Sequence, residues 1–411
     1  MHHRAKCQFF VSSLGLHDAF GIMRPSRVEE SRDACLRRGD GLMSEVITRS
    51  ADLARVAVLT RPGAVLEHRH VAIPLLRPGE VLVRVEACAV CGSDLHTAHG
   101  RRPHPLPTIL GHEAAGTVVA VGPGMTVPDV AGVAVTTGDR VTWSLCVSCG
   151  ACDRCLGGLP QKCRRLFKYG HAADDEHPLA GGFADHIVLR PGTAIVRLPA
   201  GLTAVAAASA SCAVATAAAV LRAGGEIRGR SVVVLGAGML GLSVASQAAA
   251  RGAASVTVVD ARVERLDLAA VAVPQANTVP WLADTAVLER LINGVLLADG
   301  ADLVVEAGGS AALVQAAVRL VATGGTCVLA GTVAPVGEAA FDPERIVRRQ
   351  ATIRGVHNYC PDDLSTAVSH LASPAGAGLA SLAGPVMPLD RIDEALVMAA
   401  AGAAVRVVVT P

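Results

Sequence analysis

Residues 232–261 read VVVLGAGMLGLSVASQAAARGAASVTVVDA, and this stretch decides the fold of the second half of the chain. An apolar run leads into the pattern G-x-G-x-x-G at Gly236, Gly238 and Gly241, a helix-forming segment follows, and a second apolar run ends in Asp260. The glycines allow a helix N-terminus to approach a pyrophosphate, and an acid at this distance accepts hydrogen bonds from ribose hydroxyls. The stretch therefore predicts a dinucleotide-binding unit, against the alternative of a tight turn in another α/β protein.

Asp260 also indicates which dinucleotide is bound. Its negative charge repels a 2′-phosphate, so we expect NAD rather than NADP. Arg262 and Arg265 follow closely in the sequence and weaken this preference slightly. We take Arg265 as a further residue of the cofactor site.

The pattern of predicted secondary structure changes along the chain. Residues 53–192 hold short β-rich runs such as EVLVRVEACAV, whereas from residue 213 strands alternate with Ala-rich helical segments. Such alternation is typical of a parallel sheet with helices on both faces. We therefore expect an α/β protein, with a Rossmann-type doubly wound parallel sheet plus a β-rich domain. The charged, aperiodic N-terminus is expected to be a disordered extension.

Composition argues against several partners. The 37 basic residues are balanced by 36 acidic ones and aromatic residues make up 2% of the chain, which argues against nucleic acid. Residues 203–221, TAVAAASASCAVATAAAVL, carry no charge, but Ala, Ser and Thr drive membrane insertion weakly. We expect a buried helix there and no membrane contact. Without a recognisable secretion signal we expect a cytoplasmic protein, in which clustered cysteines bind metal.

Five of the 12 cysteines fall within residues 146–163, CVSCGACDRCLGGLPQKC. Cys149, Cys152, Cys155 and Cys163 follow the spacing C-x2-C-x2-C-x7-C. Four thiolates on one short loop can close a tetrahedral zinc site that supplies folding energy rather than chemistry. An iron–sulfur site or unbound thiols are the alternatives. We interpret Cys146 as a small buried or bystander thiol.

A second set of metal-ligand side chains is spread along the chain. Residues 88–116, CAVCGSDLHTAHGRRPHPLPTILGHEAAG, contain Cys91, His112 and Glu113, and Cys212 lies downstream in SASCAVAT. With Cys91, His112 and Cys212 as ligands, a zinc ion keeps a fourth position for water or substrate, which is the mark of a catalytic site. Glu113 is either a ligand in the resting state or a group that supports the ligands.

Together, CGSDLH…GHE, the four-cysteine segment, Cys212 and the glycine pattern resemble zinc-dependent medium-chain alcohol dehydrogenases, from about Val56 to the C-terminus. More narrowly, residues 141–171 and 212–225 resemble a bacterial subgroup proposed to act in phosphonate catabolism. The resemblance implies hydride transfer between a small-molecule alcohol and NAD, two zinc ions per chain, and a dimer or tetramer. A zinc-free NAD(P)H reductase of the same fold and a non-enzymatic zinc-binding module are the competing interpretations.

The resemblance also implies roles for individual residues. Ser93 matches the hydroxyl that bonds the substrate oxygen, His96 the far end of a proton relay, and Asp94 an acid that orients the His ligand. Thr216 matches a nicotinamide contact, and Arg406 roughly matches a pyrophosphate contact.

The segment after His96, HGRRPHP, reaches the substrate pocket in the family. Arg101, Arg102 and His104 therefore place positive charge near the zinc, unless the arginines simply face solvent. Arg101 and Arg102 are our candidates for recognising an anionic substrate such as a phosphonate. Gly92 is a departure, because some relatives place a phosphate-binding Arg there.

These expectations divide the chain into four parts: a disordered extension over 1–42, a GroES-like zinc catalytic domain over 43–213 with a structural-zinc lobe at 146–163, an NAD-binding Rossmann domain over 214–357, and a return to the catalytic domain over 358–411.

Overall fold

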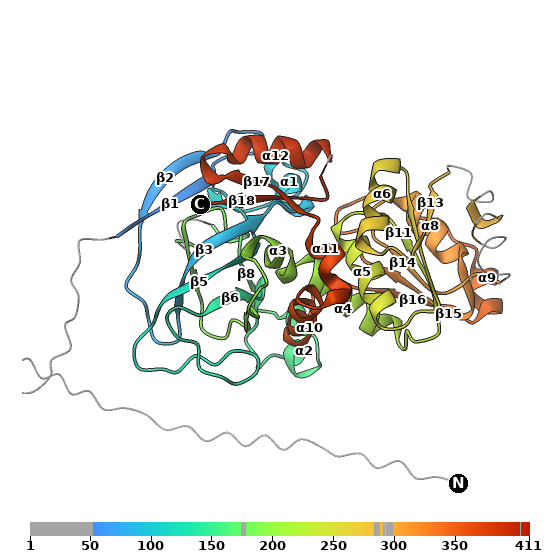
Figure 1. Cartoon of the computed structure of the whole chain (residues 1–411), viewed down its shortest axis with the longest axis horizontal. Helices are drawn as coiled ribbons and strands as arrows, with labels where there is room; N and C mark the ends of the chain where they lie inside the picture. Colours follow the sequence, from blue (N-terminus) through green and yellow to red (C-terminus); the bar gives the residue numbers. More distant parts are fainter. Residues whose placement is uncertain (1–51, 174–177, 283–287, 291, 293–298, 403) are drawn as a thin grey trace, which may run out of the picture. The chain divides into compact units, whose positions relative to one another are not determined.

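The computed structural model describes residues 52–173, 178–282, 288–290, 292, 299–402 and 404–411 (Figure 1). The expected extension over 1–42 lies outside the described residues. All elements below belong to one compact unit that begins at Ser50.

The β-rich part is built on a mixed sheet that the C-terminus completes: most neighbouring strands are antiparallel, but β17 and β18 pair in parallel. Its strands are β10 (Ile195–Arg197), β6 (Arg140–Trp143), β5 (Glu113–Val121), β3 (Val81–Ala89), β18 (Arg406–Thr410) and β17 (Ala383–Pro388), with β9 (His186–Leu189) also paired to β3. A smaller sheet holds β2 (Glu67–Ala72), β1 (Leu53–Leu59) and β4 (Thr108–Ile109). β3 is buried along most of its length, because strands flank it on both edges and side chains cover both its faces.

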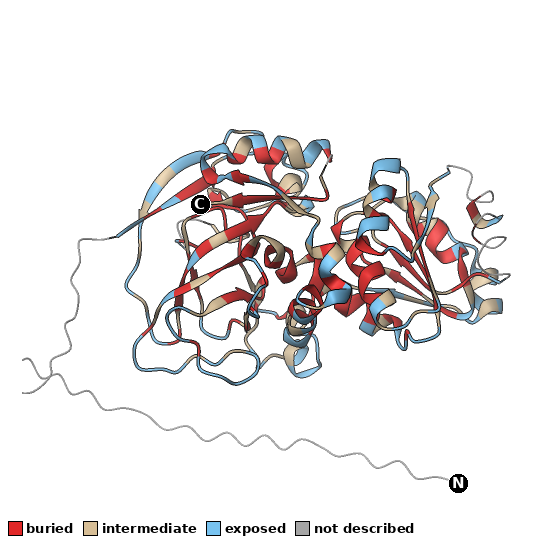
Figure 2. Cartoon of the chain, in the orientation of Figure 1, coloured by how far each residue is buried: buried red, intermediate tan, exposed pale blue. Residues whose placement is uncertain are grey.

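The second sheet is parallel, as the sequence predicts. Its order is β13 (Asn277–Pro280), β12 (Ser255–Asp260), β11 (Ser231–Leu235), β14 (Ala301–Glu306), β15 (Val321–Leu329) and β16 (Thr352–Gly355). Alternate residues of β11 enter two different cores, as period-two strands require. Val232 and Val234 pack with α4 (Ala213–Gly224), α5 (Met239–Ala250) and α6 (Val263–Ala272), whereas Val233 and Leu235 pack with α8 (Ala311–Arg319). Figure 2 shows the central strands β11 and β14 as buried.

The expected helix over 203–221 is not continuous. The structure has α3 (Ala204–Ala208), the 3₁₀ turn η2 (Ser209–Ser211) and then α4, with Cys212 in a non-helical conformation between them. The two halves meet at 47°, and among the described residues no single helix is long and apolar enough to cross a membrane, although this bent pair passes that test by length and composition alone. The break places Cys212 at the N-terminus of a helix.

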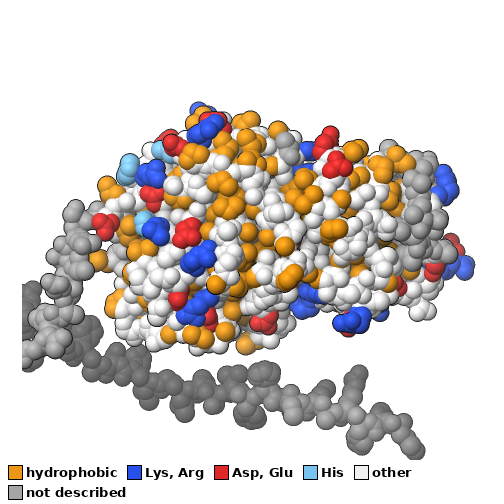
Figure 3. Space-filling view, viewed as in Figure 1, with side chains coloured by type: hydrophobic (Ala, Val, Ile, Leu, Met, Phe, Trp, Pro, Cys, Tyr) orange, Lys and Arg blue, Asp and Glu red, His pale blue; other side chains and the backbone are white. Residues whose placement is uncertain are grey.

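The C-terminal segment serves both parts. It contains α9 (Pro343–Arg349), α10 (Pro361–Leu371), η3 (Pro374–Gly376), α11 (Ala377–Ala380), η4 (Leu389–Arg391) and α12 (Ile392–Ala401). α10 contacts α4 and α11 contacts α6, whereas β18 pairs with β3. On the face shown in Figure 3, basic and acidic side chains are interspersed, in keeping with the balanced charge.

Candidate active site and metal centres

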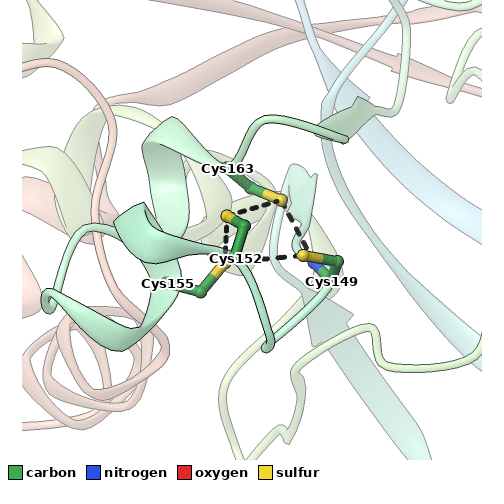
Figure 4. Close-up of side chains that lie close together, drawn as sticks. All are labelled: Cys149, Cys152, Cys155 and Cys163. Atoms are coloured by element: carbon green, nitrogen blue, oxygen red, sulfur yellow. Dashed lines mark hydrogen bonds between the residues drawn. The ribbon is translucent and has the colours of Figure 1, made fainter. Parts of the chain in front are cut away.

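The four-cysteine segment folds around a short helix. It runs from β7 (Cys146–Val147) through α2 (Asp153–Leu156) and η1 (Pro160–Lys162) to β8 (Phe167–Lys168), which pairs back with β7. Its four thiols converge (Figure 4). The Cys152 Sγ lies 3.5 Å from the Cys155 Sγ and 3.9 Å from the Cys163 Sγ. The Sγ atoms of Cys149 and Cys155 are 4.0 Å apart.

These distances fit a tetrahedral zinc ion. A Zn–S bond of about 2.3 Å implies S–S edges of about 3.8 Å. Backbone N–H groups point at the sulfurs, because the amides of Cys149 and Arg165 lie 3.2 and 3.3 Å from the Cys163 Sγ. The N–H of Ala151, followed by the Cys163 side chain, lowers the pKa of Cys149 to about 5, which favours a thiolate. The Cys149 thiolate can thus attract a cation, whereas burial, followed by the Cys152 side chain, raises the pKa of Cys155 to about 11.

The fifth cysteine of the segment stands apart. Burial raises the pKa of Cys146 to about 11, so its thiol stays protonated. Its Sγ lies 3.6 Å from the Asn358 side-chain nitrogen. This environment agrees with our interpretation of Cys146 as a bystander.

A second cluster forms from three separate elements. Cys91 caps α1 (Gly92–Ala98), His112 and Glu113 lie at the start of β5, and Cys212 precedes α4. One ligand atom from each of these four residues lies within 4.8 Å of the others. The fold therefore brings together the residues that the sequence suggested.

The His112 ring is held on both sides. Its Nδ1 lies 3.2 Å from the buried carboxylate of Asp94, and its Nε2 lies 3.2 Å from the Ser93 hydroxyl. Burial opposes protonation of His112, but Asp94 and then Cys91 outweigh it and raise the His112 pKa. The Asp94 carboxylate also accepts from the Cys91 N–H at 2.9 Å. Asp94 thus orients two candidate ligands, and Nε2 is the ring atom that faces the cluster.

Glu113 has a partner that the sequence did not indicate. The Arg406 guanidinium lies 3.0 Å from Glu113 Oε1 and donates to the Val90 carbonyl at 3.1 Å. Both side chains are buried, and burial raises the pKa of Glu113 while Arg406 opposes the rise. Arg406 thus lies against this candidate metal cluster and also lines the cleft where a cofactor contact was expected.

A cleft of about 450 Å³ joins the cluster to the glycine turn. The expected site residues that line it are Cys91, Ser93, His96, Arg102, His112, Cys212, Thr216, Gly238, Arg265 and Arg406. Arg101 is exposed and lies outside the lining, so only one of the two candidate arginines reaches the cleft. The pKa of His96 is lowered, by burial first and then by Arg101, which keeps its ring neutral near pH 7.

The glycine turn is sterically required. Gly236 has φ +111°, and a Cβ there would lie 2.8 Å from the Gly308 backbone. A Cβ on Gly241 would lie 1.8 Å from the Gly236 carbonyl oxygen. Gly238 starts α5, and the Arg265 guanidinium lies 3.4 Å from where its Cβ would be. Arg265 therefore sits at the helix N-terminus where a pyrophosphate would bind.

Asp260 lies at the end of β12, as expected. Its carboxylate accepts from the N–H groups of Ala237 at 2.7 Å and Arg262 at 2.9 Å. The Arg262 guanidinium bonds the Gly402 carbonyl. Arg262 is therefore engaged away from the Asp260 carboxylate.

Several cleft residues were missed at the sequence level: Leu145, Lys168, His171, His357 and Asn358. Two of them, Lys168 and His171, lie in the stretch FKYGH, residues 167–171. Its strand is only two residues long, so no alternation in the sequence shows that Tyr169 is buried and Lys168 faces the cleft.

Two family models match the chain. Residues 77–200 match the alcohol dehydrogenase GroES-like domain, and residues 240–373 match the zinc-binding dehydrogenase domain. The 5-exo-hydroxycamphor dehydrogenase of Pseudomonas putida is 33% identical over 366 residues, which cover 87% of this chain and 98% of that protein. An alcohol dehydrogenase of Geobacillus stearothermophilus is 34% identical over 282 residues, which cover 67% of this chain and 77% of that protein.

Solved structures agree with these relatives. An alcohol dehydrogenase from Thermotoga maritima has a TM-score of 0.81 and 30% identity, and the match covers 87% of this chain and 99% of that one. A zinc-binding dehydrogenase from Sinorhizobium meliloti 1021, bound to NADP, has a TM-score of 0.75 and 27% identity, with 88% and 100% covered. The β-rich sheet and the parallel sheet described above are thus those of a known α/β architecture.

Proposed function

Because the chain belongs to the zinc-binding alcohol dehydrogenase family, we propose that it transfers a hydride reversibly between an alcohol and NAD, giving an aldehyde or ketone. One observation carries this proposal: Cys91, His112 and Cys212 meet Ser93 and His96 in the cleft that ends at the glycine turn. The fold brings these residues from distant parts of the sequence, so chance clustering is a poor explanation.

The donor set of the cluster suits zinc. Two thiols and one imidazole are borderline-soft ligands, and three protein ligands leave a position for substrate. When bound, zinc would polarise an alcohol or carbonyl oxygen and make the alcohol more acidic. Glu113, Arg406 and Asp94 are buried beside the cluster, and charges that are costly to bury are typical of functional sites.

The chain's own groups can handle the proton. The Ser93 hydroxyl, 3.2 Å from His112 Nε2, stands beside the ligand cluster, where it can accept the proton of the substrate hydroxyl while it releases its own proton outward along the cleft. His96, neutral near pH 7, can take a proton farther out in the cleft. We assign Asp94 the role of fixing the His112 ring, and Thr216 that of contacting the nicotinamide.

We propose NAD as the cofactor. The Asp260 carboxylate is held at the end of β12 by two backbone N–H groups, where its charge would repel a 2′-phosphate. The guanidinium of Arg262, two residues beyond Asp260, bonds the Gly402 carbonyl instead. By family resemblance we also propose a structural zinc in the four-cysteine segment and a homo-oligomer, a dimer or tetramer.

The test is an assay of the zinc-loaded protein. NADH formation at 340 nm would be followed over primary and secondary alcohols and polyols, with Cys212→Ala as the matched inactive control. We expect turnover in the wild type and none above background in the variant. Turnover that survives in Cys212→Ala would contradict the assigned cluster and favour a zinc-free reductase.

A further inference from the structure

One wall of the cleft is positively charged. Arg102, from the segment after α1, and Lys168, from β8, both line the cavity that contains Cys91 and Ser93. Both are half-buried, and no ion pair or hydrogen bond among the described residues joins either of them to a carboxylate. No Asp or Glu of the described part of the chain lines this cleft. The charge on this wall is therefore unbalanced.

The cations lie close enough to affect one another. Burial lowers the pKa of Lys168, and Arg102 lowers it further while Cys146 opposes the change. The pKa of His357 is lowered to about 4, by desolvation first and then by Lys168, Lys162 and Arg102. The His357 ring is partly exposed. Because Lys168, Lys162 and Arg102 all act on this ring, the three cations lie close together around it.

The metal cluster does not account for these charges. Two thiolates balance a divalent zinc ion and Arg406 balances Glu113, so the Asp94 carboxylate is left as a single negative charge against the two cations Arg102 and Lys168. A half-buried lysine without a counter-ion costs free energy. The glycine turn has its own cation in Arg265, which is placed for the pyrophosphate.

Neutral donors stand beside the two cations. Lys162 bonds His357 Nδ1, so the His357 proton resides on Nε2 and is available to a ligand. Asn358 also lines the cleft and offers an amide. Fixed N–H donors beside a guanidinium are a typical arrangement for a carboxylate or phosphonate.

We propose that Arg102 and Lys168 form a subsite for an anionic group, so that the substrate is an alcohol bearing a carboxylate or phosphonate. This inference rests on the proposed dehydrogenase function and names its substrate class. Lys168 lies just beyond Cys163, so the four-cysteine segment would hold one wall of the substrate pocket in place.

The experiment compares three alcohols of similar length: 1-butanol, 4-hydroxybutanoate and 3-hydroxypropylphosphonate. The variants are Lys168→Met, Lys168→Arg, Arg102→Gln and Arg102→Lys, with exposed Arg101→Gln as the matched control. Melting temperatures identify any variant that fails to fold. Separately, calorimetry measures the Kd of butanoate and propylphosphonate for the NADH-loaded enzyme, which needs no turnover.

We expect the wild type to favour at least one anion over 1-butanol by about tenfold or more in kcat/KM, since desolvated charge pairs contribute at least that much. Lys168→Met and Arg102→Gln should each remove about tenfold of this preference, chiefly through KM, with 1-butanol spared. The charge-keeping variants and Arg101→Gln should retain most of it. The anion with the larger loss identifies the group as carboxylate or phosphonate.

Two results would overturn the anionic subsite, and each can be told apart from a failure of the proposed dehydrogenase activity. If 1-butanol is oxidised better than both anions, the subsite is wrong and the dehydrogenase stands. If no alcohol is oxidised, the dehydrogenase proposal fails, and calorimetry still decides the subsite. Anion binding that is absent, or unchanged in Lys168→Met and Arg102→Gln, rejects it.

Discussion

Two cysteine clusters in this molecule share the same kind of donor but differ in how the chain builds them. The four-cysteine segment takes all its ligands from residues 149–163, and backbone N–H groups hold its sulfurs. The cleft cluster takes Cys91, His112 and Cys212 from three elements, and buried charged side chains surround it. A local cluster closes a loop, whereas a dispersed one depends on the whole fold and leaves room for chemistry.

Charge separates the two clusters most clearly. Around the cleft cluster, Asp94 and Glu113 are fully buried and Arg406 is 8% exposed. Such groups lower stability unless a partner or a ligand compensates them. The four-cysteine segment has exposed charged partners instead, such as the ion pair of Asp153 with Arg164. We infer that the first environment serves reactivity and the second serves folding.

The largest expected effect is on turnover. His112→Ala should lower kcat/KM by roughly 10³-fold or more, because a metal's electrostatic contribution amounts to several kcal/mol. Steady-state assays with saturating NAD would measure it. An activity within tenfold of wild type would remove the distinction between the clusters.

The second effect is on stability. Cys152→Ser should lower the free energy of unfolding by on the order of 4–5 kcal/mol, the range in which loss of a metal site belongs. Thermal melts would measure it, with Cys360→Ser, a half-buried cysteine outside both clusters, as the control. Equal melting temperatures for the two variants would show that the four-cysteine segment does not stabilise the fold.

A third prediction concerns the cofactor end of the cleft. Asp260→Ala should shift the ratio of kcat/KM for NAD over NADP by about 10–100-fold toward NADP, since like charges in contact cost several kcal/mol. Kinetics with both cofactors would test it. A wild type that already prefers NADP would contradict the role of Asp260.

The smallest effect is expected at His96. A lowered pKa leaves this ring unprotonated at pH 7, so it can accept a proton there. His96→Gln should slow alcohol oxidation by about tenfold at pH 7, below the 10²–10⁴ typical of direct proton transfer. The deficit should shrink at pH 9, where solvent accepts the proton more readily. A deficit independent of pH would point to packing instead.

The sequence predicted what depends on local spacing. The glycine turn and the four-cysteine segment were both found this way, because their residues are neighbours along the chain. The role of Arg406 was predicted only roughly, because its contacts with Val90 and Glu113 join distant parts of the chain. Arg406 and Val90 are 316 residues apart in the sequence. The helix break at Cys212 was missed because an Ala-rich run carries no capping signal there.

The wall of the cleft that holds Arg102 and Lys168 was the least predictable region. Arg101 and Arg102 are adjacent in an irregular segment, where no periodicity tells which side chain faces inward. Lys168 lies in a two-residue strand, too short for a pattern to assign its face. Their roles depend on how the loop and the four-cysteine segment fold against the cleft.

Counting zinc tests the central claim most directly. Native mass spectrometry would compare the wild type with His112→Ala and Cys152→Ser after identical zinc loading. We predict two zinc ions per chain in the wild type and one in each variant, with activity lost in His112→Ala at temperatures where that variant is still folded. One zinc in the wild type, or a His112→Ala protein that keeps both ions, would contradict the division into a catalytic and a structural site.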